Sequence, residues 1–571
     1  MIDRRFFIKC LTATGIGSSV LHRALVSQFQ DGDELVITPQ MVKNAEWIAG
    51  TELSDEQRDE LAKAANRTAK SLQELRNVSI TFEHLPAVHF VPLVNANDQT
   101  PARRVSELSD STPVDLPTSD DELAFLPVAK LAKLIKAGQL TSRKLTSLYL
   151  DRLKRYDPVL KCVVSLTEEL ALRQAARADE EIAAGRYRGP LHGIPWGAKD
   201  LMAVPGYPTT WGIPQFKDRI IDETATVAQR LEEAGAVLVA KLSLGAIAMG
   251  DQWFGGMTRN PWNPGVGSSG SSAGSACAAA AGLVGFTIGT ETLGSILSPC
   301  RRCGTTGLRP TFGRVSRAGC MPLTWTMDKV GPIVRHVEDA AIVFQAIYGS
   351  DGLDPTVIDK PFTWPTKLDL SKVRVGYVKS RRDNAARPDL ERLQKLGVEL
   401  VEIELPSVPS ITTLTDIIGI EGASVFEEML VKNDTEGWNT WPGTFRKAQF
   451  VSALDYLRFM RIRRQLMFAM EELMQSVDVL VNANDIFVTN LTGHPSVVLP
   501  REFNEQGGWQ VPISDVFTGS LFGESTLLSL ALAYQNECTG HLVNPPLDEI
   551  IAKYQQQELD RQKNNSPSDK K

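Results

Sequence analysis

The chain has 571 residues, of which 43% are hydrophobic and 23% charged, and its formal net charge is -7 at pH 7. This composition is typical of a soluble globular protein, and the length allows one large core or several smaller ones. A net negative chain lacks the basic surface of nucleic-acid binders, so we expect no nucleic-acid partner. Seven cysteines in this length do not predict a disulfide scaffold.

The N-terminus carries a charged and apolar pattern. Asp3 to Lys9 reads Asp-Arg-Arg-Phe-Phe-Ile-Lys, and a mildly apolar stretch continues to Leu21. This pattern resembles a twin-arginine export signal, which a receptor reads and which is no anchor. We therefore expect residues 1–30 to be a signal segment, the export machinery to be a partner, and the protein to be periplasmic or otherwise exported. The alternative is a basic helical turn, with a cytoplasmic protein if the signal does not function.

Residues 31–121 are predicted to form an N-terminal helical extension and a linker. Ser54 and Gln57 stand at the N-cap and N3 positions of a helix-forming stretch, the spacing of a capping box. The stretch from Asn95 to Asp121 has the polar composition of a linker. His84 and His89 lack a third ligand at a useful spacing, so we expect no metal site there.

The main domain is predicted at residues 122–550, with a polar tail at 551–571 that is frayed from Tyr554. Helical periodicity predicts one helix from Ser142 that stops at Asp157-Pro158, and another from Thr167 to Ala184. Strands are expected in four short runs: Ala236–Ala240, Phe286–Ile288, Val373–Tyr377 and Val477–Val481. Strands separated by helices predict a single large α/β domain whose central sheet has helices on both faces.

Lys199, Ser271 and Ser295 are the candidate catalytic residues. Lys199 follows a largely apolar run with two glycines and a proline, as the last residue of a buried strand would. Ser271 lies in the small-residue segment Gly265 to Gly282, which ends in a strongly helix-forming alanine run, and Ser295 follows 24 residues later. A hydroxyl nucleophile needs a base, and a lysine serves at neutral pH only when burial or charge lowers its pKa.

A different hydrolase pattern is also present. Gly270 to Gly274 fits the Gly-x-Ser-x-Gly elbow of α/β-hydrolases, with Ser272 as nucleophile and a later histidine as base. That elbow needs an apolar strand directly before it, and the sequence offers none. We therefore favour the lysine-based alternative.

An ordered series of motifs around these residues resembles the amidase signature family. The resemblance extends from about Glu122 to Pro546. Its motifs are Gly193-Ile-Pro195, Lys199-Asp200, Lys241, Ala248-Met-Gly250, Asn263-Pro264, Cys303 to Arg317, Asp328-x-x-Gly-Pro332, Gly493 to Pro500 and Glu524 to Leu528. The resemblance implies a mixed central sheet and a hydrolase that converts a linear carboxamide into an acid and an amine or ammonia, without metal or cofactor.

The resemblance also implies a role for each site residue. Ser295 would be the nucleophile, Ser271 the bridging serine after a cis peptide bond, and Lys199 the general base. The backbone N–H groups of Thr292, Leu293, Gly294 and Ser295 would form the oxyanion hole. Three further residues lie in or beside the motifs and either line an acyl pocket or pack in the core: Trp196, Trp253 and Met249.

The chain departs from the family pattern near the nucleophile. The family has Asp-x-Gly-Gly-Ser with arginine two residues after the nucleophile, whereas this chain has Glu291, Leu293 and Leu297. We expect Arg301 or Arg302 to replace the missing arginine, and Leu293 to restrict the backbone where glycine is usual. Two alternatives stay open: a glutaminase component of a tRNA-dependent amidotransferase, and a binding homologue that has lost catalysis. The sequence does not determine the oligomeric state.

Overall fold

The computed structural model describes residues 36–49, 51–78, 88, 108–110, 112–379 and 387–564. The chain forms two compact units, each assembled from separate segments. One comprises Met1–Phe90, Pro322–Thr326 and Pro406–Met470, and the other comprises Val91–Met321, Met327–Leu405 and Glu471–Lys571. The predicted export signal, His84 and His89 lie outside the described residues.

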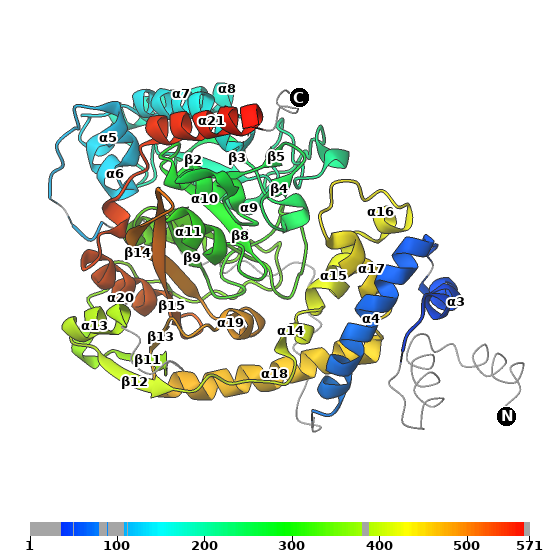
Figure 1. Ribbon diagram of the computed structural model, residues 1–571. Coiled ribbons are helices and arrows are strands. Elements are labelled where there is room, and N and C mark those ends of the chain that lie inside the picture. Colours follow the sequence, from blue (N-terminus) through cyan, green and yellow to red (C-terminus); the bar gives the residue numbers. More distant parts are fainter. Residues whose placement is uncertain are drawn as a thin grey trace, which may run out of the picture. The chain divides into compact units, whose positions relative to one another are not determined.

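The second unit is built on an 11-stranded mixed sheet with the strand order β1-β3-β2-β8-β10-β9-β14-β15-β13-β11-β12 (Figure 1). The strands of this sheet are β1 (Val163–Leu166), β2 (Pro195–Lys199), β3 (Val237–Leu242), β8 (Phe286–Glu291), β9 (Thr306–Arg309), β10 (Lys329–Val334), β11 (Arg374–Val378), β12 (Glu399–Ile403), β13 (Val479–Val481), β14 (Ser496–Gln506) and β15 (Trp509–Gly519). Two short hairpins lie outside it: β4 (Gln252–Trp253) with β5 (Gly256–Met257), and β6 (Arg259–Asn260) with β7 (Asn263–Gly267). All four predicted strands belong to the large sheet.

Helices cover both faces of this sheet. They are α5 (Asp120–Phe125), α6 (Val128–Lys136), α7 (Ser142–Leu160), α8 (Glu168–Ala183), α9 (Thr226–Glu233), α10 (Ala273–Ala280), α11 (Leu297–Cys303), α12 (Val337–Ile347), α13 (Pro388–Lys395), α19 (Ile486–Thr492), α20 (Glu524–Asn536) and α21 (Leu547–Asn564), with short 3₁₀ turns at Pro214–Phe216, Ala246–Ala248, Leu370–Lys372 and Gly540–Leu542. Every residue of α10 is buried, because its alanines and glycine let it lie close against the strands. The predicted α/β fold with a mixed central sheet is confirmed.

Two predicted boundaries are wrong. Helix α7 does not stop at Asp157-Pro158 but continues through Pro158 to Leu160, where Lys161 takes a left-handed conformation. The Asp157 carboxylate supports this end by accepting the N–H groups of Cys162 and Val163 at 2.7 and 2.8 Å. The C-terminal segment is helical up to Asn564 rather than frayed from Tyr554, since the buried Leu547 and Ile550 anchor α21.

The first unit is helical. Its helices are α3 (Pro39–Ala49), α4 (Asp55–Arg76), α14 (Ile411–Leu414), α15 (Ile417–Val425), α16 (Glu427–Val431), α17 (Trp441–Ala448) and most of α18 (Ala453–Ser476). The predicted capping box is present: the Ser54 N–H donates to Gln57 Oε1 at 2.9 Å, and the Gln57 N–H donates to Ser54 Oγ at 3.2 Å. Residues 406–470 belong to this unit and not to the main domain predicted at residues 122–550. None of the described helices is long and apolar enough to cross a membrane.

Candidate active site

Lys199 is the last residue of β2, a strand whose five residues are all buried. The strand lies between β3 and β8 and runs parallel to both, and the Lys199 side chain is at 0% exposure. Its Nζ donates to Ser271 Oγ at 2.9 Å, to Ser272 Oγ at 3.1 Å and to Thr290 Oγ1 at 2.7 Å. Burial lowers the pKa of Lys199 to about 7, although Asp328 and Glu291 act in the opposite direction.

Ser271 follows a cis peptide bond at Gly270–Ser271, directly before α10. Only glycine fits at position 270, because a Cβ there would lie 1.8 Å from the carbonyl oxygen of Gly250. Ser271 is buried, and its hydroxyl accepts a hydrogen bond from Lys199. The structure therefore brings together two of the three predicted catalytic residues in direct contact.

Ser295 lies on the loop between β8 and α11 and is 8% exposed. The Ser272 N–H donates to the Ser295 carbonyl oxygen at 3.1 Å, which ties this loop to the segment that carries Ser271. In the described part of the chain, no hydrogen bond joins the hydroxyls of Ser271 and Ser295. The Ser295 hydroxyl makes no hydrogen bond with the described residues.

The predicted oxyanion loop presents unused backbone donors. Among the described residues, the N–H groups of Thr292, Leu293, Gly294 and Ser295 find no acceptor. Gly294 has a φ of 85°, whereas Leu293 does not enter the positive-φ region. Glycine is therefore required at position 294 only, and leucine at position 293 causes no backbone strain.

Glu291, at the end of β8, holds this loop in place. Its Oε2 accepts the N–H groups of Ile296 and Leu297 at 2.9 and 3.0 Å, while its Oε1 accepts from Arg309 at 2.8 Å and from Asn490 at 3.0 Å. Burial raises the pKa of Glu291, but Arg309 and Lys329 outweigh it and hold the value at about 2. The carboxylate is ionised and fully engaged.

The expected replacement for the family's arginine is corrected by this contact. The partner of Glu291 is Arg309 on β9, with both side chains at 0% exposure, and not Arg301 or Arg302, which are exposed at the end of α11. Leu297 instead packs into a buried cluster with Ile296 and Cys300. An acid–base pair therefore lies near Ser295, and its basic member comes from another strand.

A second buried lysine lies beside the first. Lys241 on β3 forms an ion pair with Asp200 at 2.7 Å, and both side chains are at 0% exposure. Its Nζ also donates to the Pro208 carbonyl oxygen at 2.9 Å and to Thr209 Oγ1 at 3.0 Å. The motif residues Asp200 and Lys241 were not predicted to pair, and Thr290 was not predicted as a partner of Lys199.

The three proposed pocket residues differ in their surroundings. Trp196 is 1% exposed and stacks on Phe286 with ring centroids 6.0 Å apart, so it is a core residue. Trp253 is half-buried in the β4–β5 hairpin, with its ring 4.8 Å from that of Phe254. Met249 is half-buried after the short 3₁₀ turn that ends at Ala248.

The histidine-based alternative disagrees with the geometry. Ser272 Oγ donates to the Thr290 carbonyl oxygen at 3.0 Å and contacts Lys199. His494 contacts Thr492 at 2.7 Å, and His336 and His541 face each other with ring centroids 5.0 Å apart. Within the described residues no histidine reaches Ser272, and no group of side chains is arranged to hold a metal ion.

Comparison with known proteins identifies the family. The model of the amidase family matches residues 144–484. The chain belongs to the amidase family. It is 30% identical over 482 residues to a glutamyl-tRNA(Gln) amidotransferase subunit of Thermosynechococcus vestitus, covering 74% of this chain and 99% of that protein. It is 31% identical over 467 residues to an amidase of Pseudomonas putida, covering 74% of this chain and 98% of that protein.

A solved structure agrees with this assignment. Native peptide amidase from Stenotrophomonas maltophilia superposes with a TM-score of 0.63 at 29% sequence identity, covering 74% of this chain and 98% of that one. The predicted family, fold class and amide-hydrolysing enzyme class are confirmed.

Proposed function

We propose that this amidase cleaves a linear carboxamide through an acyl-enzyme on Ser295, with Ser271 as proton relay and Lys199 as general base. One observation carries the proposal: Lys199 is buried, donates to Ser271 at 2.9 Å, and has a pKa lowered to about 7 by its burial. A lysine in this state is partly neutral at physiological pH, as a general base must be.

In the proposed mechanism, neutral Lys199 takes a proton from Ser271 while Ser271 takes the proton of Ser295. The Ser295 oxygen attacks the amide carbon, and the developing oxyanion accepts from the free N–H groups of residues 292–295. Collapse of the tetrahedral intermediate breaks the C–N bond, and the proton held by Lys199 returns through Ser271 to the leaving nitrogen. Water then repeats the sequence on the ester and releases the acid.

A glutaminase component of an amidotransferase is the second candidate function. The match to a glutamyl-tRNA(Gln) amidotransferase subunit over 99% of its length favours it. Such a protein is expected to hydrolyse glutamine only with its partner proteins present. The intact Glu291–Arg309 pair supports catalysis over a purely binding homologue, because it keeps the loop of Ser295 fixed.

The proposal is tested with purified protein and a panel of amides, anilides, carbamates, esters and glutamine. Loss of turnover in both Lys199→Ala and Ser295→Ala, with turnover kept in Lys217→Ala, an exposed lysine, is the expected result. Turnover that survives in Lys199→Ala near the wild-type rate would exclude the mechanism. Glutamine turnover that appears only with the other amidotransferase components added would favour the second candidate.

Export through the twin-arginine route is a further part of the proposal, supported by the sequence Arg4-Arg5 and its neighbours. Cell fractionation of the full chain should find the protein in the periplasm, and Arg4→Lys with Arg5→Lys should retain it in the cytoplasm. An unchanged distribution in the double variant would contradict export by this signal.

A further inference from the structure

A groove of about 1230 Å³ lies in the second unit beside the loop that carries Ser295. One part of its wall is the first turn of α11, where Leu297 and Ser298 follow shortly after the nucleophile. Another is Ile486 of α19, whose side chain lies 3.0 Å from the place of a Cβ on Gly294. The whole stretch of β15 from Trp509 to Val516 lines the groove as well.

The edge of β15 that faces away from β14 is unpaired over most of its length. Strand β13 pairs only with Phe517 to Gly519 of β15. Just before them, the Val516 N–H donates to Asn482 Oδ1 and its carbonyl accepts the Asn482 N–H, both at 2.9 Å. Alternate residues of a strand direct their backbone groups to the same edge. Gln510, Pro512 and Ser514 therefore share this edge, and their backbone groups have no partner there among the described residues.

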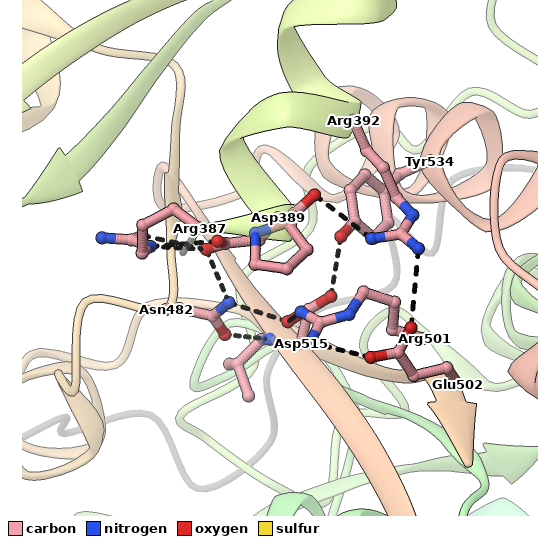
Figure 2. A network of polar contacts seen from close by, with 10 residues as sticks. Arg387, Asp389, Arg392, Asn482, Arg501, Glu502, Asp515 and Tyr534 are labelled. Atoms are coloured by element: carbon pink, nitrogen blue, oxygen red, sulfur yellow. Dashed lines mark hydrogen bonds and ion pairs between the residues drawn. The ribbon is translucent and has the colours of Figure 1, made fainter. Parts of the chain in front are cut away.

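A polar network closes one end of this free edge (Figure 2). Asp515 accepts from Arg501 at 2.8 Å, from Asn482 at 2.9 Å and from the Tyr534 hydroxyl at 2.7 Å. Asn482 also donates to Asp389 at 2.9 Å. The charged groups at this end pair with one another, so the network holds β15 in place.

Three other groups in the groove remain unsatisfied. Asp485 is 6% exposed, and its Oδ2 has no hydrogen-bond partner in the described part of the chain. The Ser514 hydroxyl is buried without a partner among the same residues. Arg301 is exposed and forms no ion pair with any described residue. A peptide is complementary to the free edge of β15, because its N–H donors and carbonyl acceptors alternate along its length.

We infer that this groove binds the acyl chain of a peptide amide as an added strand along the free edge of β15, which presents its C-terminal amide to Ser295. Strand addition of this kind supplies affinity through backbone hydrogen bonds. From Gln510 to Ser514 the free edge extends about 14 Å at ~3.4 Å per residue, room for about four or five residues. This inference rests on the proposed function and narrows its substrate class from carboxamides to peptide amides.

The test is the dependence of kcat/KM on chain length, measured with N-acetylated peptide amides of one to six alternating Thr and Val residues. The kcat/KM values should rise with length and level off at about four or five residues, where the free edge ends. Ser514→Pro removes an edge N–H at a position where strands tolerate proline. This variant should lower the ratio of kcat/KM for the longest substrate to kcat/KM for the shortest ~5-fold, which corresponds to the loss of about one hydrogen bond.

Glu505→Pro is the matched control. Glu505 pairs with Gln510 in the same hairpin, is exposed, and directs its N–H to the opposite edge of β14. This proline should leave the length ratio as in the wild type. The inference would be overturned if Ser514→Pro kept the wild-type ratio of kcat/KM between the longest and the shortest substrate. It would also be overturned if both proline variants lowered this ratio equally.

Hydrogen–deuterium exchange gives a readout that needs no turnover. In Ser295→Ala, the six-residue peptide amide should slow exchange in residues 509–516, and the same peptide should give no such protection in the double variant with Ser514→Pro. Unchanged exchange in Ser295→Ala would overturn strand addition. Failure of the proposed function is separate, since it would show as turnover of the one-residue amide that persists in Lys199→Ala.

Discussion

Two buried lysines stand at the ends of neighbouring parallel strands, and their surroundings differ in one respect. Lys199 and Lys241 are both at 0% exposure, on β2 and β3. Lys241 forms an ion pair with Asp200 at 2.7 Å. Lys199 contacts only neutral oxygens of the described residues, among them those of Ser271 and Thr290. The same degree of burial therefore produces a structural ion pair at one position and a candidate base at the other.

The missing counter-charge is what suits Lys199 to proton transfer. A buried ammonium without a carboxylate loses hydration and gains little in return, so its neutral form is favoured. The pKa of Lys199 falls to about 7 for this reason, first through burial. Asp200, the next residue in the chain, is directed to Lys241 instead. The second lysine thus keeps the nearest carboxylate away from the first.

The largest effect is expected from Lys199→Met, which removes the base and keeps the side-chain volume. We expect kcat/KM to fall ~10⁴-fold, at the upper end of general-base effects. Steady-state kinetics on any substrate of the wild type measures it. A loss of less than about tenfold would place the base elsewhere.

Lys241→Met should act on stability rather than on proton transfer. It leaves Asp200 buried without its partner, so the free energy of unfolding should drop by about 3–5 kcal/mol. Urea unfolding followed by circular dichroism measures the change, with exposed Lys217→Met as the matched control. Unfolding free energies that agree for both variants would contradict a structural role for the pair.

Removing the charge of Lys199 should stabilise the fold, in contrast to the loss of stability expected for Lys241→Met. Its folded-state pKa of about 7 lies below the ordinary lysine value of 10.5, so the unfolded chain binds more protons between these values. Wild-type stability should therefore rise with pH from 7 toward 10.5 on account of this group. Lys199→Met should raise the unfolding free energy by about 1–2 kcal/mol at neutral pH, and the gain should shrink as pH rises. A destabilised variant would mean that the lysine is well compensated in the folded state.

Thr290→Val should give the smallest effect. The substitution removes the hydroxyl that accepts from Lys199 at 2.7 Å and leaves the carbonyl contact at 3.3 Å. Since the charged lysine loses an acceptor, its pKa should fall further, and the acid limb of the pH profile should move to lower pH. The plateau of kcat/KM should drop about fivefold from the lost orientation. A pH profile that keeps its position would assign the hydroxyl a packing role only.

Local sequence patterns predicted the elements that carry Lys199 and Ser271. The buried strand before Lys199 and the helix after Ser271 follow from composition and periodicity, and the structure places these two residues in contact. Arg309 was not predicted as the partner of Glu291. Their strands, β9 and β8, lie near each other only because of the order of strands in the sheet, which the sequence does not reveal. Arg301 and Arg302, which are closer in sequence, were therefore predicted in its place.

Longer-range features lay beyond sequence patterns. Residues 406–470 and the N-terminal helices belong to one unit, and neither segment carries a sequence motif that predicts this packing. Trp196 lies in a motif and still packs in the core, because motif position does not determine which face of a strand a side chain occupies. The free edge of β15 likewise depends on how few residues β13 pairs with.

The most direct test of the central claim is the pH dependence of Ser295 labelling by a fluorophosphonate, which needs no known substrate. In the wild type the labelling rate should rise with pH and show an inflection near a pKa of about 7, as Lys199 loses its proton. In Lys199→Met the rate should be low, and the inflection should disappear. An inflection at the same pH that persists in Lys199→Met would contradict the account, because another group would then activate the nucleophile.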